Sequence, residues 1–183
     1  MTDLKADKAK LLELIQRDAF KTGEFTLASG AKSNYYIDGR LLSLSSDGAH
    51  VLARVILAMI DDDTIDAVGG MTMGADPIVG AVLAVADAQG RTLNGFLCRK
   101  ERKGHGTGKL IEGNLKAGDR VLMVEDVVTS GGSTLRAIDA VEELGGQVVR
   151  VIAMVDRLAG AAEAFGERGY TFTPIFTVRD LGV

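Results

Sequence analysis

Cysteine and histidine are scarce in this chain of 183 residues. Cys98 is the only cysteine, and His50 and His105 are the only histidines. A single cysteine excludes an intramolecular disulfide framework and favours a reducing compartment, so we expect a cytoplasmic protein. Two histidines far apart in the sequence and one cysteine give no zinc-type ligand set.

Long apolar runs are also absent. The longest, at 78–86, is less than half of the roughly 20 residues that a membrane-spanning helix needs. The N-terminus carries Asp3 and Asp7 among its lysines and lacks the apolar core of a signal peptide. We therefore expect neither a signal peptide nor a membrane partner.

No charge of one sign dominates. Lys and Arg number 21 and Asp and Glu number 25, which gives a net charge of -4. This balance argues against a uniformly basic nucleic-acid-binding protein. Hydrophobic residues make up 46% of the chain and charged residues 25%, as in folded proteins. The length predicts one domain over residues 1–183, which buries roughly 70% of the surface exposed when unfolded.

Proline is rare and glycine is abundant, at 2 and 23 residues. The glycines cluster beside apolar segments, which is typical of shaped loops on a rigid scaffold. Five apolar runs alternate with segments of helical spacing. The predicted strands are 65–68, 93–98, 121–128, 148–155 and 170–176; the predicted helices are 4–20, 47–60, 76–89, 133–144 and 158–168; a hairpin joins 25–27 to 35–37. This order predicts an α/β fold with a mostly parallel five-stranded sheet flanked by helices, and a ligand site at the carboxyl ends of its strands.

Segment 120–135 carries the strongest chemical pattern. An apolar strand ends in two carboxylates, Glu125 and Asp126, and a loop of two hydroxyl residues and two glycines, 129–132, then leads into a helix. Glycine N–H groups and a helix N-terminus suit a phosphate. Adjacent carboxylates instead suit sugar hydroxyls or a metal ion, because they repel a phosphate. A phosphate beside a diol is the shape of a ribose 5-phosphate.

Spacing excludes two other phosphate motifs. A P-loop requires a lysine after its second glycine, but no lysine follows Gly132, and the pair 108–109 lacks the glycine five positions earlier. The Gly-x-Gly-x-x-Gly spacing of a dinucleotide-binding turn does not occur between a strand and a helix. An ordinary strand–loop–helix turn with an incidental acidic pair remains as an alternative, although adjacent carboxylates repel each other.

Positive charge is concentrated in segment 99–109. It holds five Lys or Arg residues and one acid, Glu101. Its three alternating glycines predict a loop that closes like a lid over a polyanion and stabilises the charge on a departing group. A solvated charged loop and a nucleic-acid-binding loop are the alternatives. The second would need interleaved aromatic side chains for stacking, and this loop has none.

These motifs together resemble the type I phosphoribosyltransferases. Segment 125–133 is similar to the family's binding motif for phosphoribosyl diphosphate (PRPP), and the basic loop with segments 25–30 and 33–38 is similar to members that act on orotate. The similarity spans about 20–160. It implies the type I phosphoribosyltransferase fold, with a small N-terminal hood to which the helix and hairpin of about 1–42 contribute.

The resemblance also implies an activity. Members acting on orotate transfer the 5-phosphoribosyl group from PRPP to orotate, with Mg²⁺ bound through PRPP, and give orotidine 5'-phosphate and pyrophosphate for pyrimidine biosynthesis. The catalytic residues implied here are Lys103, His105 and Asp126. The residues implied to bind PRPP are Arg99, Lys100, Lys103, His105, Glu125, Asp126, Val127, Val128, Thr129, Ser130, Gly131, Gly132 and Ser133; those implied to bind orotate are Thr129 and Arg157. Apart from the resemblance, strand alternation directs either Tyr35 or Tyr36 toward the ligand, with the other in the core, and we expect Tyr36 to bind orotate. The family further implies a homodimer in which loop 99–109 is shared across the interface.

Two positions depart from some bacterial members of that group. Those members carry lysine where Ala28 stands and Tyr-Lys where Met73-Gly74 stands. Without these lysines, segment 69–74 would hold pyrophosphate through backbone N–H groups. A purine phosphoribosyltransferase and a non-catalytic PRPP-sensing regulator are the alternative functions. The hairpin and Arg157 argue against the first, and 183 residues leave no room for the DNA-binding domain that the second usually adds.

Three further features are expected to be structural. The acids at 61–63 lack the spacing of a calcium loop and are interpreted as a solvated helix end. His50 is interpreted as a packed or surface residue of a helix, and Cys98 as a small buried hydrophobe.

Overall fold

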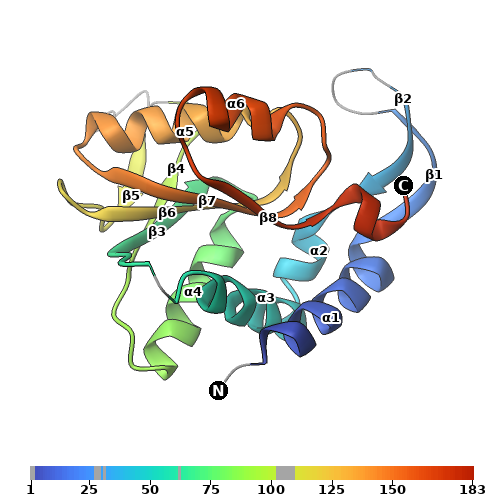
Figure 1. Ribbon diagram of the computed structural model, residues 1–183, viewed down its shortest axis with the longest axis horizontal. Helices are drawn as coiled ribbons and strands as arrows, with labels where there is room; N and C mark the ends of the chain where they lie inside the picture. The colour runs from blue at the N-terminus through green and yellow to red at the C-terminus, as the bar shows by residue number, and fades with distance from the viewer. Residues whose placement is uncertain (1–2, 27–29, 31, 62, 102–109) are drawn as a thin grey trace.

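A six-stranded sheet forms the centre of the computed structural model, which describes residues 3–26, 30, 32–61, 63–101 and 110–183 (Figure 1). The strand order is β5–β4–β3–β6–β7–β8. The strands are β3 (Ala67–Met71), β4 (Asn94–Cys98), β5 (Ile111–Gly113), β6 (Arg120–Val128), β7 (Gln147–Asp156) and β8 (Phe172–Thr177). Strand β5 pairs antiparallel with β4, and the other neighbours are parallel. The predicted α/β class and the five parallel strands are confirmed. The sequence analysis missed β5, because three residues are too few to show an alternating pattern.

Strand β3 begins and ends later in the chain than the predicted 65–68. It runs through Gly69 and Gly70 to Met71, and all of its residues are buried. A Cβ atom at Gly69 would lie 2.4 Å from the ring of Phe96, and one at Gly70 would lie 2.2 Å from the Val124 carbonyl oxygen. The two glycines are therefore needed for close packing inside the sheet, and the expected glycine loop begins only after Met71.

Helices cover both faces of the sheet (Figure 1). They are α1 (Leu4–Leu14), continued by the π-helical turn η1 (Ile15–Ala19), α2 (Gly39–Ser43), α3 (Ser46–Met59), α4 (Asp76–Ala88), α5 (Gly132–Glu143), α6 (Ala161–Glu167) and the 3-10 turn η2 (Val178–Leu181). The side chains of successive β6 residues point to opposite faces of the sheet. Leu122 and Val124 join the core with α1, α3 and α4, whereas Val121 and Met123 join the core with α5 and α6. Among the described residues, no helix is long and apolar enough to cross a membrane.

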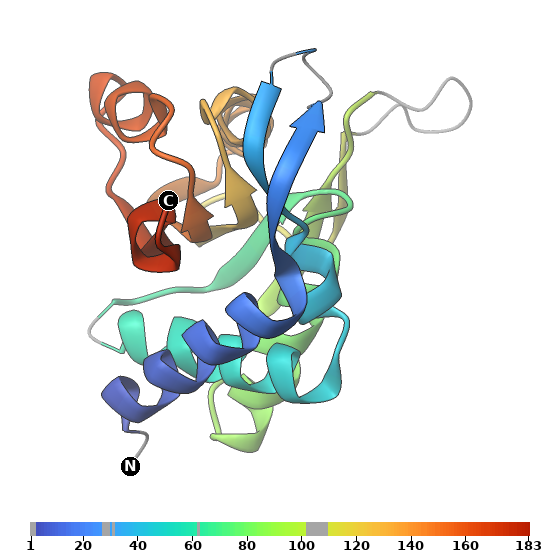
Figure 2. The ribbon, with the colours of Figure 1, turned by 90° about the vertical axis from the view of Figure 1, so that its right-hand side faces the viewer.

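The predicted hairpin is present and longer than expected. Strand β1 (Phe20–Thr26) begins directly after η1 and pairs antiparallel with β2 (Lys32–Ile37). Figure 2 shows it rising from the end of η1 as a separate two-stranded arm. Helix α1 packs on α3, and the Asp7 carboxylate pairs with the Arg54 guanidinium at 2.9 Å.

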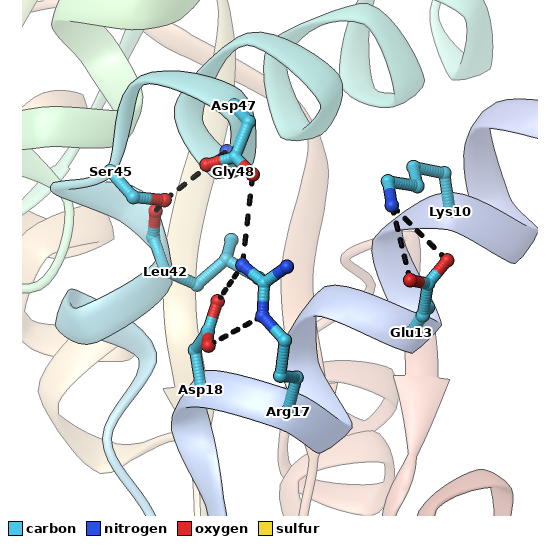
Figure 3. Close-up of polar contacts among 8 residues, drawn as sticks. All are labelled: Lys10, Glu13, Arg17, Asp18, Leu42, Ser45, Asp47 and Gly48. Carbon is cyan, nitrogen blue, oxygen red and sulfur yellow. Dashed lines mark hydrogen bonds and ion pairs between the residues drawn. The ribbon is translucent and has the colours of Figure 1, made fainter.

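Polar contacts join the end of η1 to the start of α3 (Figure 3). The Arg17 guanidinium contacts the carboxylates of Asp18 and Asp47, the latter at 3.7 Å. The Ser45 hydroxyl accepts a hydrogen bond from the Gly48 N–H at 3.2 Å, so Ser45 caps the start of α3. These contacts hold the base of the hairpin beside the helical layer.

Candidate active site

A cavity of about 960 Å³ opens at the carboxyl ends of β3, β4 and β6. Its lining comes from five separate parts of the chain. The lining residues are 36–40, 71–74, 97, 99–101, 112 and 125–134. The sheet thus brings the glycine loop, the acidic pair, the start of the basic segment and the end of the hairpin to one site, where parallel sheets commonly bind ligands.

The turn from β6 into α5 has the geometry of a phosphate cradle. Gly131 stands immediately before the helix with φ +76°, and a Cβ atom there would lie 3.0 Å from the Phe165 ring. Glycine is therefore required by both the backbone angle and the packing. The first N–H groups of a helix have no partner within it, and the helix dipole adds partial positive charge. The described turn is suited to hold a phosphate at 129–133, as the sequence predicts.

The acidic pair lies beside this cradle, and two glycines enclose one of its members. A Cβ atom at Gly39 would lie 2.8 Å from the Asp126 Cβ, and one at Gly74 would lie 2.5 Å from Asp126 Oδ1. Backbone from two other segments therefore approaches Asp126 closely. No local pattern marks Gly39 as part of the site, because Asp126 is far from it in the chain. A side chain cannot be added at Gly74 without displacing the Asp126 carboxylate.

Glu125 is in an unusual electrostatic environment. Burial, followed by the negative charge of Asp126, raises the pKa of Glu125 to about 8. The Thr134 hydroxyl donates a 2.9 Å hydrogen bond to Glu125 Oε2, which acts in the opposite direction. Groups with such shifted pKa values concentrate at functional sites.

The raised pKa predicts a pH dependence of stability. The folded chain holds the Glu125 proton between about pH 4.5 and pH 8, whereas the unfolded chain releases it near 4.5. Since the folded state binds more protons in this window, stability should fall as the pH rises through it. The melting temperature of the wild type should therefore decline relative to that of Glu125→Gln between about pH 4.5 and pH 8. Below pH 4.5, the stability that the protonated Glu125 contributes to the folded state is fully present. Parallel melting curves across this range would contradict the shift.

Arg40 contributes a positive charge that the sequence analysis missed. Its guanidinium holds both oxygens of Asp38 at 2.8 and 2.9 Å, and this pairing lowers the pKa of the Asp38 carboxyl. Both residues line the cavity, and the charge of Asp126 acts on Arg40. The cavity wall thus carries a fixed cation near the acidic pair.

The segment after β3 forms another wall of the cavity. The Thr72 hydroxyl donates a 2.7 Å hydrogen bond to the Asp76 carboxylate at the start of α4, and Met73 is exposed. The peptide bond between Thr72 and Met73 is cis. This wall is short, because Gly69 and Gly70 belong to β3.

The basic segment begins at the rim of the cavity. Arg99 and Lys100 both line it, and the Arg99 guanidinium lies 3.7 Å from the Glu112 carboxylate on β5. The Arg99 N–H donates to the Leu110 carbonyl at 2.8 Å, which closes the base of the segment. Lys103, His105 and the glycines 104, 106 and 108 lie outside the described residues, as does Ala28.

The structure separates the residues implied for orotate. Thr129 and Tyr36 line the main cavity. Arg157 lines a second cavity of about 730 Å³, together with hairpin residues 24–25 and 32–35. There the Arg157 Nε donates a 3.3 Å hydrogen bond to the Tyr35 hydroxyl, and its guanidinium lies 4.9 Å from the centre of the Tyr35 ring.

The residues that are expected to be structural lie outside the main cavity. Asp63 pairs with Arg150 at 3.0 Å and Asp61 lies 3.5 Å from Arg91, so these acids bind arginines as well as solvent. His50 is exposed. Cys98 is buried, as predicted, and burial raises the pKa of its thiol to about 12.

Comparison with known proteins agrees with this geometry. Residues 43–166 match the family model "Phosphoribosyl transferase domain". The chain is 44% identical over 183 residues to orotate phosphoribosyltransferase of Rhodopirellula baltica, covering 97% of this chain and 95% of the relative. Solved structures of the Mycobacterium tuberculosis H37Rv orotate phosphoribosyltransferase superpose with TM-scores of 0.85 (40% identity) and, for its complex with PRPP, 0.82 (37% identity); each covers 97% of this chain and 99% of the other. The chain belongs to the phosphoribosyltransferase family, within its group of orotate phosphoribosyltransferases.

Proposed function

We propose that this chain joins N1 of orotate to C1 of the ribose of PRPP and expels pyrophosphate, using the cavity at the carboxyl ends of β3, β4 and β6. The observation that carries the proposal is the phosphate cradle at 129–133 lying beside the carboxylates of Glu125 and Asp126 in one cavity. The relative from M. tuberculosis has been solved in complex with PRPP, a ligand that combines these two features.

Each part of PRPP has a proposed counterpart. The 5-phosphate binds the N–H groups of the cradle, and the ribose hydroxyls bind Glu125 and Asp126. The residues proposed for the 5-phosphate are Val127, Val128, Thr129, Ser130, Gly131, Gly132 and Ser133; those for the pyrophosphate are Arg99, Lys100, Lys103 and His105. Lys103, His105 and Asp126 are proposed as catalytic. The described residues act as one phosphoribosyltransferase unit, with about 1–42 contributing the hood.

Orotate is proposed to bind between the hairpin and the strand ends. Thr129 and Tyr36 already line the main cavity. Arginine is suited to hold the carboxylate of orotate by two parallel hydrogen bonds. For Arg157 to do so, its guanidinium must leave Tyr35 and turn toward the main cavity.

The chemistry needs stabilisation of a leaving group. The C1–oxygen bond to pyrophosphate breaks and the ribose gains positive charge; the N1–C1 bond then forms, and the proton that N1 loses goes to solvent or to the released pyrophosphate. Mg²⁺ bound to PRPP would neutralise part of the pyrophosphate charge. Glu125 and Asp126 offer hard oxygen ligands near it, whereas the described residues contain no group of three or more His, Cys, Asp or Glu placed to hold a metal. The residues of the basic segment stabilise the departing anion.

Two copies of the chain are proposed to pair, so that segment 99–109 of one closes over the cavity of the other. Arg99 and Lys100, the first two residues of the segment, line the cavity. Specific activity should then fall when the protein is diluted below the dissociation constant of the pair.

We also propose a cytoplasmic location. The single, buried thiol of Cys98 suits a reducing compartment, and cell fractionation checks the location.

Orotate consumption, followed by its absorbance, tests the proposal. With PRPP and Mg²⁺ present, we expect orotate to be consumed, and chelation of the metal with EDTA should abolish the signal. Adenine, hypoxanthine and guanine serve as matched bases. Turnover of a purine in place of orotate would show a purine phosphoribosyltransferase, and PRPP binding without turnover of any base would show a sensor.

A further inference from the structure

The hydroxyl of Thr134 is a buried polar group that contacts the acidic pair. Thr134 lies in the first turn of α5, is only 1% exposed and donates a 2.9 Å hydrogen bond to Glu125 Oε2. The residue comes directly after the cradle, so it joins the helix that faces the phosphate to the strand that carries the carboxylates.

This bond distinguishes the two oxygens of Glu125. Oε2 is held by Thr134, whereas Oε1 is directed toward Gly74, where a Cβ atom would lie 3.0 Å from it. The segment containing Gly74 lines the cavity. Thr134 therefore holds Oε2, whereas Oε1 lies on the side of the cavity wall, and the neighbouring Asp126 also interacts with the Glu125 carboxyl group. A carboxylate without such a partner would sample several rotamers and would lose this freedom on binding a ligand.

We infer that Thr134 is a positioning residue: its hydroxyl holds Oε2 of Glu125 so that Oε1, on the cavity side, accepts a hydrogen bond from a ribose hydroxyl. The inference rests on the proposed function, because it requires Glu125 to bind the sugar of PRPP. It goes further, because it assigns the start of α5 a role in binding both the phosphate and the ribose diol of the ligand. The backbone of this turn binds the phosphate, and the Thr134 side chain prepares the diol site.

The test compares two ligands that differ by the sugar. Ribose 5-phosphate contains the phosphate and the diol, whereas inorganic phosphate contains the phosphate alone. In Thr134→Val the shape of the side chain is kept and the hydroxyl is lost. Calorimetric titration at about pH 9, above the raised pKa of Glu125, should show binding of ribose 5-phosphate about tenfold weaker than in the wild type, which is the loss expected when the hydrogen bond that orients a charged carboxylate is removed. Binding of inorganic phosphate should be unchanged.

Three further variants make the result specific. Thr134→Ser keeps the hydroxyl and should restore ribose 5-phosphate binding to within about twofold of the wild type. Thr134→Ala carries the same prediction as Thr134→Val and replaces it if the valine variant does not fold. Thr173→Val makes the same change on the edge strand β8 and should bind both ligands as the wild type does.

The outcomes separate the inference from the proposed function. Unchanged ribose 5-phosphate binding in folded Thr134→Val would overturn the inference alone. Equal losses for both ligands would also overturn it, since the hydroxyl would then support the cradle as a whole. A wild-type protein that binds ribose 5-phosphate no better than phosphate would overturn both, because the acidic pair would not bind the sugar.

Discussion

Replacing Asp126 with asparagine should lower the turnover of orotate and PRPP by about a hundredfold or more and leave the protein folded. The two side chains have the same shape, so the close approaches of Gly39 and Gly74 are preserved. The substitution replaces one carboxylate oxygen with an amide NH2 group, which donates hydrogen bonds instead of accepting them. The proposed site loses a negative charge next to the sugar, where positive charge develops in the transition state.

The matched control for this change is Asp139→Asn. Asp139 is an exposed acid of α5 that pairs with Arg168 at 2.6 Å, outside the residues that line the cavity. Its variant should retain turnover within about twofold of the wild type, since exposed ion pairs contribute little. Initial rates with orotate and circular dichroism measure activity and folding for both proteins. An Asp126→Asn protein that is as active as the control would remove Asp126 from the catalytic residues.

The strand, loop and helix of the phosphate cradle could be predicted because their signals are local. An apolar run, two glycines and helical spacing follow one another within 120–144, and the structure places β6, the turn and α5 there. The positive φ of Gly131 is likewise a local requirement. The Ser45 cap was predictable for the same reason, since a cap needs only the first turn of its own helix.

Contacts between distant segments could not be predicted in this way. Gly39 and Gly74 enclose Asp126 only because the sheet and hairpin bring three parts of the chain together. The Arg40–Asp38 pair faces the cavity for the same reason. Arg157 follows β7 as expected, but its guanidinium packs against the aromatic ring of Tyr35 and lines the second cavity. Sequence spacing identifies which residue types are available, and tertiary packing decides where they point.

The glycines of β3 show how one pattern can have two causes. The cluster at 69–74 was interpreted as a single loop that approaches a ligand, since glycine permits close approach. Gly74 fits that interpretation, because it lies against the acidic pair. Gly69 and Gly70 instead make room for Phe96 and Val124 within the protein. The sequence shows the need for small residues but does not show whether a ligand or the protein core fills the space.

Gly70→Ala should be among the most destabilising single substitutions in this chain. The added Cβ atom would lie 2.2 Å from the Val124 carbonyl oxygen and 2.6 Å from the Ala75 Cβ. The first belongs to the backbone of β6 and the second stands at the start of α4, so neither can rotate away as a flexible side chain would. Overpacking of this kind costs about 3 kcal/mol, which lowers the melting temperature of a chain of this size by roughly 6–12 °C.

Gly80→Ala is the matched control, because it adds the same methyl group where nothing lies within 4 Å. Gly80 is exposed in the middle of α4, and alanine there should stabilise the protein by about 0.5–1 kcal/mol. Thermal unfolding of both variants measures the contrast. If Gly70→Ala melted within about 2 °C of the wild type, the packing assigned to β3 would be wrong. If it is destabilised as expected, the fraction that remains folded should also turn over orotate more slowly, because a shift at Gly70 moves the wall of the cavity that begins at Met71.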